Sequence, residues 1–268
     1  MGIFSSLTEK GLEFFFSTIG FRDVLIDDDS DILPYIEAAL QHTPFADLKL
    51  GDKVLGRYYE HAVRFLGDNH IVKFVSPEPA ELMRRWLDSL EKQKIILERY
   101  LPYSLPPFSY FYVPVEKEWN RRKGGSENLS SRSKSALATY ALVMRRVNGN
   151  PLYKLSDCEI FSNQTVVKNL VRFLDGNKKM RKKQGLFADL IGGEGLHILN
   201  PRYTGNIYVT KEGGVELVDT VLIPPKYSPG IMPAKYRFAK LYHFCYRNFV
   251  LPRENSFYSR LKKEAIIN

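Results

Sequence analysis

The spacing of apolar residues predicts a short sheet, a long helix and further strands in the first half of the chain. Residues 62–65 and 71–75 are strand-like runs around a Gly67-Asp68-Asn69 turn, and residues 54–59 precede them, so we expect a three-stranded meander. An aromatic strand over 108–115 and a buried strand from 137 onward come later. Between them, residues 81–100 predict a helix with one apolar face, formed by Leu82, Met83, Trp86, Leu87, Leu90 and Leu97.

Both ends of the chain and the region after residue 155 are predicted to be helical. Residues 1–49 form a helical preface in which the acidic run 27–31 caps a helix reaching Leu40, because acidic residues complement a helix N-terminus. Ser156 and Glu159 have capping-box spacing and begin a further helix that carries apolar residues between 166 and 173. Helices over 236–249 and 257–266 are expected to follow.

A polar loop followed by a hairpin supplies candidate metal ligands. Asn206 ends the loop, residues 207–209 begin a strand, and a turn at 212–214 returns the chain through residues 215–218 to Asp219. Because an antiparallel hairpin places the start of one strand beside the end of the other, we expect the Asn206 amide oxygen and the Asp219 carboxylate to be neighbours. Two oxygen ligands suit Mg²⁺, which also binds water and substrate phosphates. An ordinary hairpin with a solvated Asn and Asp is the alternative.

This arrangement resembles the metal-binding half of the protein-kinase-like superfamily, which includes small-molecule and lipopolysaccharide kinases. The resemblance implies that Asn206 and Asp219 hold Mg²⁺ on the phosphates of ATP. In the family a catalytic Asp lies five residues before the Asn, and Pro201 stands at that position here, with Leu199 where a His is usual.

An alignment in which the loop has gained one residue gives a second reading of the catalytic loop. In that alignment His197 and Asn200 fill the places of the family's His and Asp. Neither alignment supplies a carboxylate, so the resemblance implies a degenerate catalytic loop. His197 is the candidate base, and a structural His held by hydrogen bonds is the alternative.

A lysine and a glutamate follow in the order that the family has. Lys73 lies in the middle of the third strand, where the resemblance implies a contact with the nucleotide phosphates. The alternative is a lysine that points to solvent from the polar face of the sheet. Glu91 in the next helix is the candidate partner of Lys73, with Glu81 and Glu98 as rivals.

The segment after the strand from 137 is similar to the linker between the lobes of small-molecule kinases. Its polar residues, a Gly, a spacer and Pro-Leu end at residue 152, and its centre is Met144, Arg145 and Val147. The resemblance implies that backbone groups of this linker bind the adenine edge. A generic turn at Asn-Gly is the alternative.

Taken in order, these features imply an α+β protein with the two-lobed protein-kinase-like fold. We expect a small antiparallel sheet lobe over residues 49–147 and a compact, mostly helical lobe over 148–268. An additional helical segment over residues 1–48 precedes them.

Composition and charge indicate a folded protein with anionic partners. Of the 268 residues, 44% are hydrophobic and 26% are charged, and the net charge is +9. This charge implies anionic partners such as nucleotide phosphates, a phosphorylated substrate, anionic lipid or nucleic acid, and by itself it chooses none of these. The family resemblance implies a nucleotide and an anionic small-molecule or glycolipid substrate. Cys158 and Cys245 are too isolated for a disulfide framework, so we expect a reducing compartment, the cytoplasm.

Basic clusters and an apolar N-terminal stretch predict a peripheral contact with the inner membrane surface. These clusters lie at 121–135 and 178–183, and the apolar residues between 7 and 19 form a candidate amphipathic helix. Solvated basic segments and an N-terminal helix packed on the core are the alternatives. No nucleic-acid motif surrounds the clusters. The start of the chain fits the myristoylation pattern and lacks a secretory signal, and no run approaches about 20 apolar residues.

Three functions are consistent with these features. The first is ATP- and Mg²⁺-dependent phosphoryl transfer to a small-molecule, sugar or lipopolysaccharide hydroxyl. The second is a pseudokinase, a kinase-like fold that serves as a binding or regulatory module, which explains Pro201 directly. The third is a basic membrane- or nucleic-acid-associated adaptor, which makes no use of Asn206 and Asp219.

Overall fold

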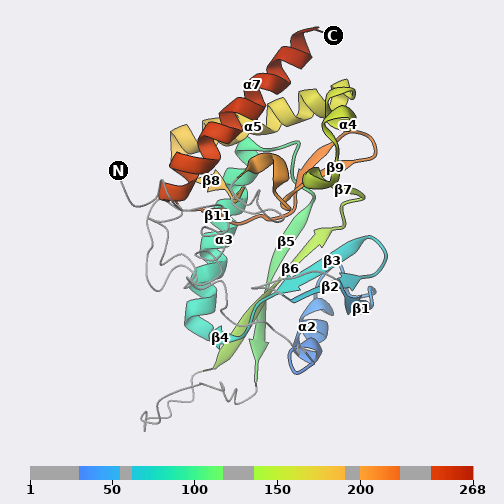
Figure 1. Cartoon of the computed structure of the whole chain (residues 1–268). Coiled ribbons are helices and arrows are strands. Elements are labelled where there is room, and N and C mark those ends of the chain that lie inside the picture. The colour runs from blue at the N-terminus through green and yellow to red at the C-terminus, as the bar shows by residue number, and fades with distance from the viewer. Residues whose placement is uncertain (1–29, 55–61, 117–135, 191–199, 224–242, 268) are drawn as a thin grey trace, which may run out of the picture. The chain divides into compact units, whose positions relative to one another are not determined.

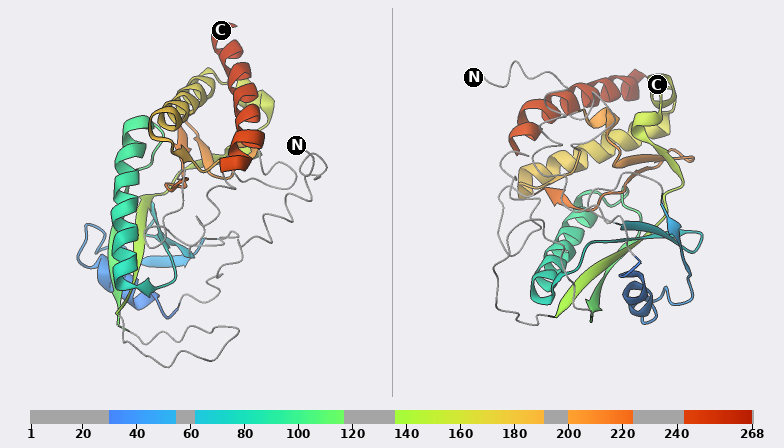
Figure 2. Two further views of the ribbon diagram at one scale, coloured as in Figure 1. Left: turned by 90° about the vertical axis from the view of Figure 1, so that its left-hand side faces the viewer. Right: turned by 60° about the horizontal axis from the view of Figure 1, so that its bottom comes forward.

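The computed structural model describes residues 30–54, 62–116, 136–190, 200–223 and 243–267 (Figures 1 and 2). These residues separate into two compact units. The sheet unit contains the described residues up to 88 and those from 108 to 145, and the helical unit contains residues 89–107 and the described residues from 146 onward. The boundary therefore falls inside one helix, α3 (Ala80–Tyr100).

The sheet unit is built on a six-stranded antiparallel sheet with the order β1-β2-β3-β6-β4, in which β5 also pairs with β6. The predicted meander and the two later strands are confirmed. The first strand begins at Leu50, however, and not at 54, and residues 55–61 lie outside the described part. The strands are β1 (Leu50–Lys53), β2 (Ala62–Leu66), β3 (His70–Phe74), β4 (Glu78–Pro79), β5 (Phe108–Val115) and β6 (Leu137–Arg145).

Helix α2 (Leu33–Leu40) covers one face of this sheet (Figure 1). Ile32, Ile36 and Leu40 are buried and pack with the buried Val72 and Phe74 of β3. The N-cap of this helix is Ile32, which makes no side-chain capping hydrogen bond, and residues 27–29 of the predicted acidic cap lie outside the described residues. The helix is stabilised by apolar burial instead.

The long helix predicted over 81–100 is confirmed as α3, which begins one residue earlier. Met83 and Leu97 have no exposed surface, and Trp86 and Leu90 are also buried, so the predicted apolar face is the buried face. The order of a three-stranded meander, a helix and two longer strands is the order that the resemblance implied.

The helical unit contains two small antiparallel sheets and the long helices α5 and α7. One sheet has the order β10-β9-β7 and the other pairs β11 with β8. The helices α5 and α7 pack side by side (Figures 1 and 2). The elements are β7 (Gly149–Pro151), η1 (Leu152–Lys154), α4 (Asp157–Phe161), α5 (Gln164–Gln184), β8 (Phe187–Ala188), η3 (Pro201–Tyr203), β9 (Ile207–Thr210), β10 (Val215–Leu217), β11 (Leu222–Ile223), the π-helix η5 (Tyr246–Val250) and α7 (Leu251–Ile267).

One helix predicted in the helical unit is two helices in the structure. The capping box of Ser156 and Glu159 is present, but the helix that it begins ends at Phe161. Asn163 then starts α5, since its Oδ1 accepts hydrogen bonds from the backbone N–H groups of Thr165 and Val166. A second polar N-cap so soon after the first splits the predicted helix in two.

The C-terminal region is one helical run and not two separate helices. Residues 243–245 are helical, the π-helix η5 follows, and α7 continues without a break from Leu251 to Ile267. A π-turn adds a residue to the helix without ending it, which a period of 3.6 residues does not reveal. Most of the helix predicted over 236–249 lies outside the described residues.

The α+β class with an antiparallel sheet and a mostly helical second unit is therefore confirmed. Within the described ranges, no helix is both long enough and apolar enough to cross a membrane. The N-terminal residues 1–29 and the basic segment 117–135 lie outside those ranges.

A buried polar network holds the π-helix against α5. The Tyr246 hydroxyl donates to Glu254, and it accepts from Asn177 Nδ2 at 3.1 Å and from Arg181 Nη1 at 2.9 Å. Arg181 also pairs with Glu254 at 3.2 Å, and Asn177 Oδ1 accepts from the Ala188 N–H of β8 at 3.1 Å. Burial and then the charge of Glu254 raise the pKa of Tyr246 well above its usual value of 10.0.

We predict that Tyr246→Phe lowers the free energy of unfolding by about 1–3 kcal/mol at neutral pH, because the buried Asn177 and Glu254 and the half-buried Arg181 lose their hydrogen-bonding partner. The folded state keeps the Tyr246 phenol neutral, so this residue's contribution is complete below pH 10.0 and declines as the pH rises above that value. Urea unfolding measured from neutral pH to above pH 10.0 should therefore show the free energies of unfolding of wild type and variant converging at alkaline pH.

The matched control is Tyr103→Phe, because Tyr103 is 75% exposed. That variant should follow the wild type at every pH. A constant gap between wild type and Tyr246→Phe from neutral to alkaline pH would contradict the linkage.

Candidate functional site

The hairpin predicted around the candidate metal ligands is present with the expected register. β9 and β10 pair Ile207 with Leu217 and Val209 with Val215. The turn closes through hydrogen bonds between Thr210 and residues 213 and 214, and Gly213 has a φ of 80°, which favours glycine. One residue beyond the ladder, the Val218 N–H donates to the Asn206 carbonyl at 2.9 Å. Asn206 therefore lies opposite the residue that precedes Asp219.

The Asn206 side chain is anchored by its amide nitrogen. Nδ2 donates to the Asp189 carbonyl at 3.0 Å, and the backbone N–H of Asn206 donates to Thr204 Oγ1 at 3.2 Å. With Nδ2 held by a carbonyl, Oδ1 is the end of the amide that can accept a hydrogen bond or bind a cation.

Asp219 is connected to the same part of the unit by a second route. Its Oδ1 accepts from the Val221 N–H at 3.1 Å, and β11 follows directly. β11 pairs Leu222 with Ala188, the residue before Asp189. The Asp189 carbonyl, which anchors Asn206, therefore comes directly after β8, and β8 pairs with the strand that follows Asp219.

The two oxygen-bearing side chains fit a magnesium ion better than a transition metal. Both are half-buried, and no described basic side chain forms an ion pair with Asp219. In the described ranges, no group of three or more His, Cys, Asp and Glu side chains forms a metal cluster. An amide oxygen and a carboxylate leave room for the water and phosphate ligands that Mg²⁺ retains.

The stretch in the position of the family's catalytic loop is structural where it is described. Asn200 is the N-cap of η3, and its Oδ1 accepts from the Arg202 N–H at 3.1 Å. Pro201 is buried at the first helical position, where its missing N–H costs nothing. Asn200 therefore has its acceptor oxygen engaged in the cap, and His197 lies outside the described residues.

Arg202 is a structural residue that the sequence did not predict. It is only 6% exposed, and its guanidinium donates to the carbonyls of Leu152 and Leu155. Its Nε lies 3.5 Å from Asp157 Oδ1. Burial lowers the pKa of Arg202, while the Asp157 carboxylate opposes that shift. Arg202 thus connects η3, which lies shortly before Asn206 in the chain, to residues 152–155 after β7.

Lys73 is confirmed in the middle of β3 and does not lie on a polar face. It pairs with Val63 of β2 and with Leu142 of β6, so these three side chains share one face of the sheet. Val63 is 1% exposed and Leu142 is 5% exposed, and Lys73 is half-buried. Lys73 is therefore partly shielded from solvent, and its contact with nucleotide phosphates stays a prediction.

The glutamates proposed to accompany Lys73 all lie on α3, with different surroundings. Glu81 pairs with Arg85. Glu91 and Glu98 are exposed, and the described contacts give Glu91 no ion pair. Lys73 belongs to the sheet unit and Glu91 to the helical unit, so a Lys73–Glu91 pair stays a prediction.

The predicted linker is shorter than the sequence indicated. Met144 and Arg145 are the last residues of β6, where Met144 lies opposite both Ile71 and Phe108 and is 1% exposed. The irregular segment is 146–148, which contains Val147, and β7 begins at Gly149. Strand pairing therefore continues further along the chain than the polar residues suggested, and the adenine contact stays a prediction.

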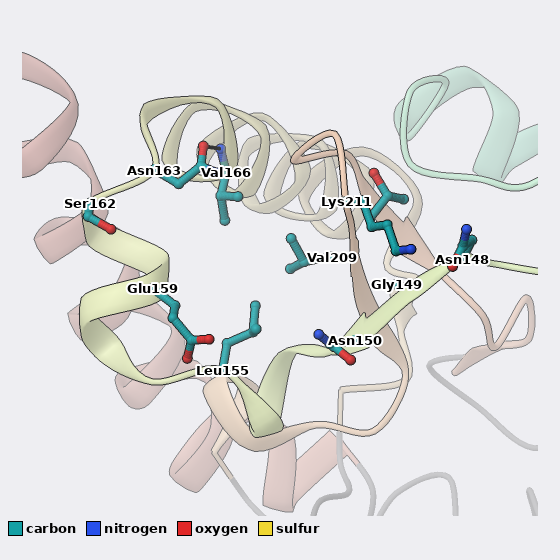
Figure 3. Close-up of a pocket in the computed structure, with 11 residues that line it drawn as sticks. Asn148, Gly149, Asn150, Leu155, Glu159, Ser162, Asn163, Val166, Val209 and Lys211 are labelled. Atoms are coloured by element: carbon teal, nitrogen blue, oxygen red, sulfur yellow. Dashed lines mark hydrogen bonds between the residues drawn. The ribbon is translucent and has the colours of Figure 1, made fainter.

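A pocket of about 420 Å³ lies within the helical unit, apart from these candidate residues (Figure 3). None of the predicted site residues lines it. Gly149 is required beside it, because a Cβ there would lie 2.2 Å from the Val209 carbonyl oxygen. The pocket combines apolar and polar lining groups, which suits a small polar molecule. The apolar lining groups include Leu155, Val166 and Val209, and the polar ones include Asn150, Glu159 and Lys211.

Comparisons with known proteins give only distant likenesses. No family model matches the sequence, and no curated protein matches it. A solved structure of the aminoglycoside phosphotransferase APH(2'')-IIIa with GDP and kanamycin is 12% identical, with a TM-score of 0.36 over 87% of this chain and 86% of that chain.

A GDP complex of a mutant aminoglycoside phosphotransferase IIIa is 13% identical, with a TM-score of 0.30 over 55% of this chain. The chain spans 41% of that structure's length. The fold assignment rests on the strand order and connections described above and not on these likenesses.

We predict that Arg202→Lys lowers the free energy of unfolding by roughly 2–3 kcal/mol, because one ammonium group cannot span the two carbonyls that the guanidinium joins. The matched control is Arg260→Lys, since Arg260 binds the same Asp157 at 2.6 Å but is 54% exposed. The control should change stability by less than about 0.5 kcal/mol. Equal losses in urea unfolding would contradict the structural role of Arg202.

Proposed function

We propose that this chain is a nucleotide- and Mg²⁺-dependent phosphotransferase of the protein-kinase-like superfamily, acting on a small-molecule, sugar or lipopolysaccharide hydroxyl. The observation that carries the proposal is the register of β9 and β10, which places Asn206 opposite Val218 and next to the Asp219 position. The anchoring of the Asn206 amide on the Asp189 carbonyl supports it, because it presents Oδ1 as an available oxygen ligand.

Each candidate side chain has a defined role in this proposal. Asn206 and Asp219 hold Mg²⁺, which neutralises the nucleotide phosphates. Lys73 binds those phosphates, and its buried apolar neighbours support this role because a partly desolvated cation attracts anions more strongly. Glu91 fixes Lys73, and backbone groups near Met144 to Val147 bind the base.

Neither alignment of the catalytic loop supplies a carboxylate base. Pro201 stands at the base position, and Asn200 uses its side-chain oxygen to cap η3, so His197 is the candidate base. General-base help contributes roughly 10²–10⁴-fold, whereas positioning and charge stabilisation contribute most of the acceleration in phosphoryl transfer. We therefore expect slow but measurable turnover.

A pseudokinase is the second candidate function. The observation that favours it concerns residues 200–202. Pro201 is buried, and the side chains of Asn200 and Arg202 are engaged in hydrogen bonds to the backbone. In this role the chain would bind nucleotide, or no nucleotide, and act through a partner. The two free cysteines, one of them buried, support placing either function in a reducing cytoplasm.

We predict that ATP or GTP raises the melting temperature only in the presence of Mg²⁺, and that Lys73→Ala and Asp219→Ala each abolish the shift. A ligand at about 100 times its dissociation constant adds roughly 2.7 kcal/mol to the stability of the folded state, which a thermal-shift titration detects readily. Lys49→Ala and Asp47→Ala are the matched controls, since both residues are exposed and lie outside the candidate site.

Turnover distinguishes the two candidate functions. Release of phosphate from nucleotide that is lost in Asp219→Ala and reduced in His197→Ala supports the enzyme. A Mg²⁺-dependent shift without any turnover supports the pseudokinase. The absence of any shift with either nucleotide would refute the nucleotide site itself.

A further inference from the structure

The C-terminal half of α5 separates its buried and charged residues onto opposite sides. Phe173, Leu174, Asn177 and Met180 are buried, whereas the residues facing solvent are Arg172, Lys178, Lys179, Lys182 and Lys183. Asp175 is the one acidic residue of α5. This face of the helix is therefore strongly cationic.

Helix α7 packs beside α5 (Figure 2). Its lysines extend the cationic face of α5. The link between them is Tyr258, whose ring centroid lies 5.7 Å from Lys178 Nζ and 4.7 Å from Lys262 Nζ. The Tyr258 hydroxyl donates to Asp175 Oδ1. Lys178 and Lys262 thus meet on one seam, and the single acidic residue of α5 is occupied there by a hydrogen bond.

An exposed apolar side chain, Ile266, lies beside Lys262 on α7. Ile266 is 82% exposed, the highest value among the exposed large hydrophobic residues in the described ranges. It follows Lys262 by four residues on α7, so the two side chains are neighbours on the helix surface. Lys263 is also exposed on this turn.

This combination favours an anionic bilayer over a nucleic acid. Proteins that bind single strands offer free aromatic faces for base stacking, but the Tyr258 ring is already occupied by two ammonium groups. Lipid surfaces attract clustered lysines through their anionic headgroups and accept an apolar side chain at the boundary with the acyl chains.

We propose that the α5–α7 basic surface, formed by Lys178, Lys179, Lys182, Lys262, Lys263 and Ile266, docks on an anionic lipid bilayer. The surface uses none of the residues assigned to phosphoryl transfer, so the docking is independent of the proposed catalysis. Each lysine near such a surface strengthens binding about fivefold, and the effect fades with added salt.

The test is co-sedimentation of the full chain with vesicles of phosphatidylcholine alone and of phosphatidylcholine with roughly a third phosphatidylserine. We expect salt-sensitive binding to the second vesicles only. The triple variant Lys178→Gln, Lys182→Gln and Lys262→Gln should bind roughly 100-fold more weakly. Ile266→Ser should weaken binding while leaving its salt dependence unchanged.

The control has the same net charge but keeps the surface intact. It carries Lys49→Gln, Lys92→Gln and Lys211→Gln, all at exposed positions outside α5 and α7. Equal weakening in both triple variants would overturn the proposal, as would unchanged binding in the first one. Binding of a single-stranded RNA but not of either vesicle, lost in the first variant, would assign the surface to nucleic acid and also overturn it. Equal melting temperatures confirm that the variants are folded.

Discussion

The hydrogen bond from Asn206 to the Asp189 carbonyl is the contact on which the candidate metal site depends. Asp189 follows β8, which pairs with β11, and Asn206 precedes β9, which pairs with β10. Asp219 lies on the connection between β10 and β11. Two short ladders are therefore joined at the place where both candidate ligands lie, and either ladder alone is too short to fix them.

The stretch before Asn206 makes structural contacts of its own. Pro201 begins a short helix that Asn200 caps, and Arg202 binds carbonyls 47 and 50 residues earlier in the chain. The stretch serves as a brace for the loop before Asn206. A buried arginine that satisfies two carbonyls rigidifies its surroundings, so this stretch is held in place by contacts distant in the sequence.

Much of the fold followed from the sequence, because its signals are local. Apolar periodicity gave α3, and turn chemistry gave the β9–β10 hairpin; the Ser156 capping box gave the start of α4. The errors arose where distant contacts decide the outcome. The strand β6 continues through Met144 because two neighbouring strands pair with it, and the π-turn at Tyr246 is held by Arg181 and Asn177 from α5.

The candidate site was predictable to a smaller extent. The position of Lys73 in a strand and the hairpin between Asn206 and Asp219 could be predicted from local pattern and turn chemistry, whereas the roles of these residues stay predictions. Arg202 had no local signal, since its carbonyl partners lie far away along the chain. The anchoring carbonyl of Asp189 was equally invisible, because a backbone acceptor has no sequence signature.

The most direct measurement is a crystal structure of the protein with Mg²⁺ and a non-hydrolysable ATP analogue. We predict a metal ion bound by Asn206 Oδ1 and the Asp219 carboxylate, with phosphate oxygens and water completing six ligands at about 2.0–2.1 Å. A nucleotide or a metal ion bound without either side chain would contradict the proposed site, and with it the phosphotransferase.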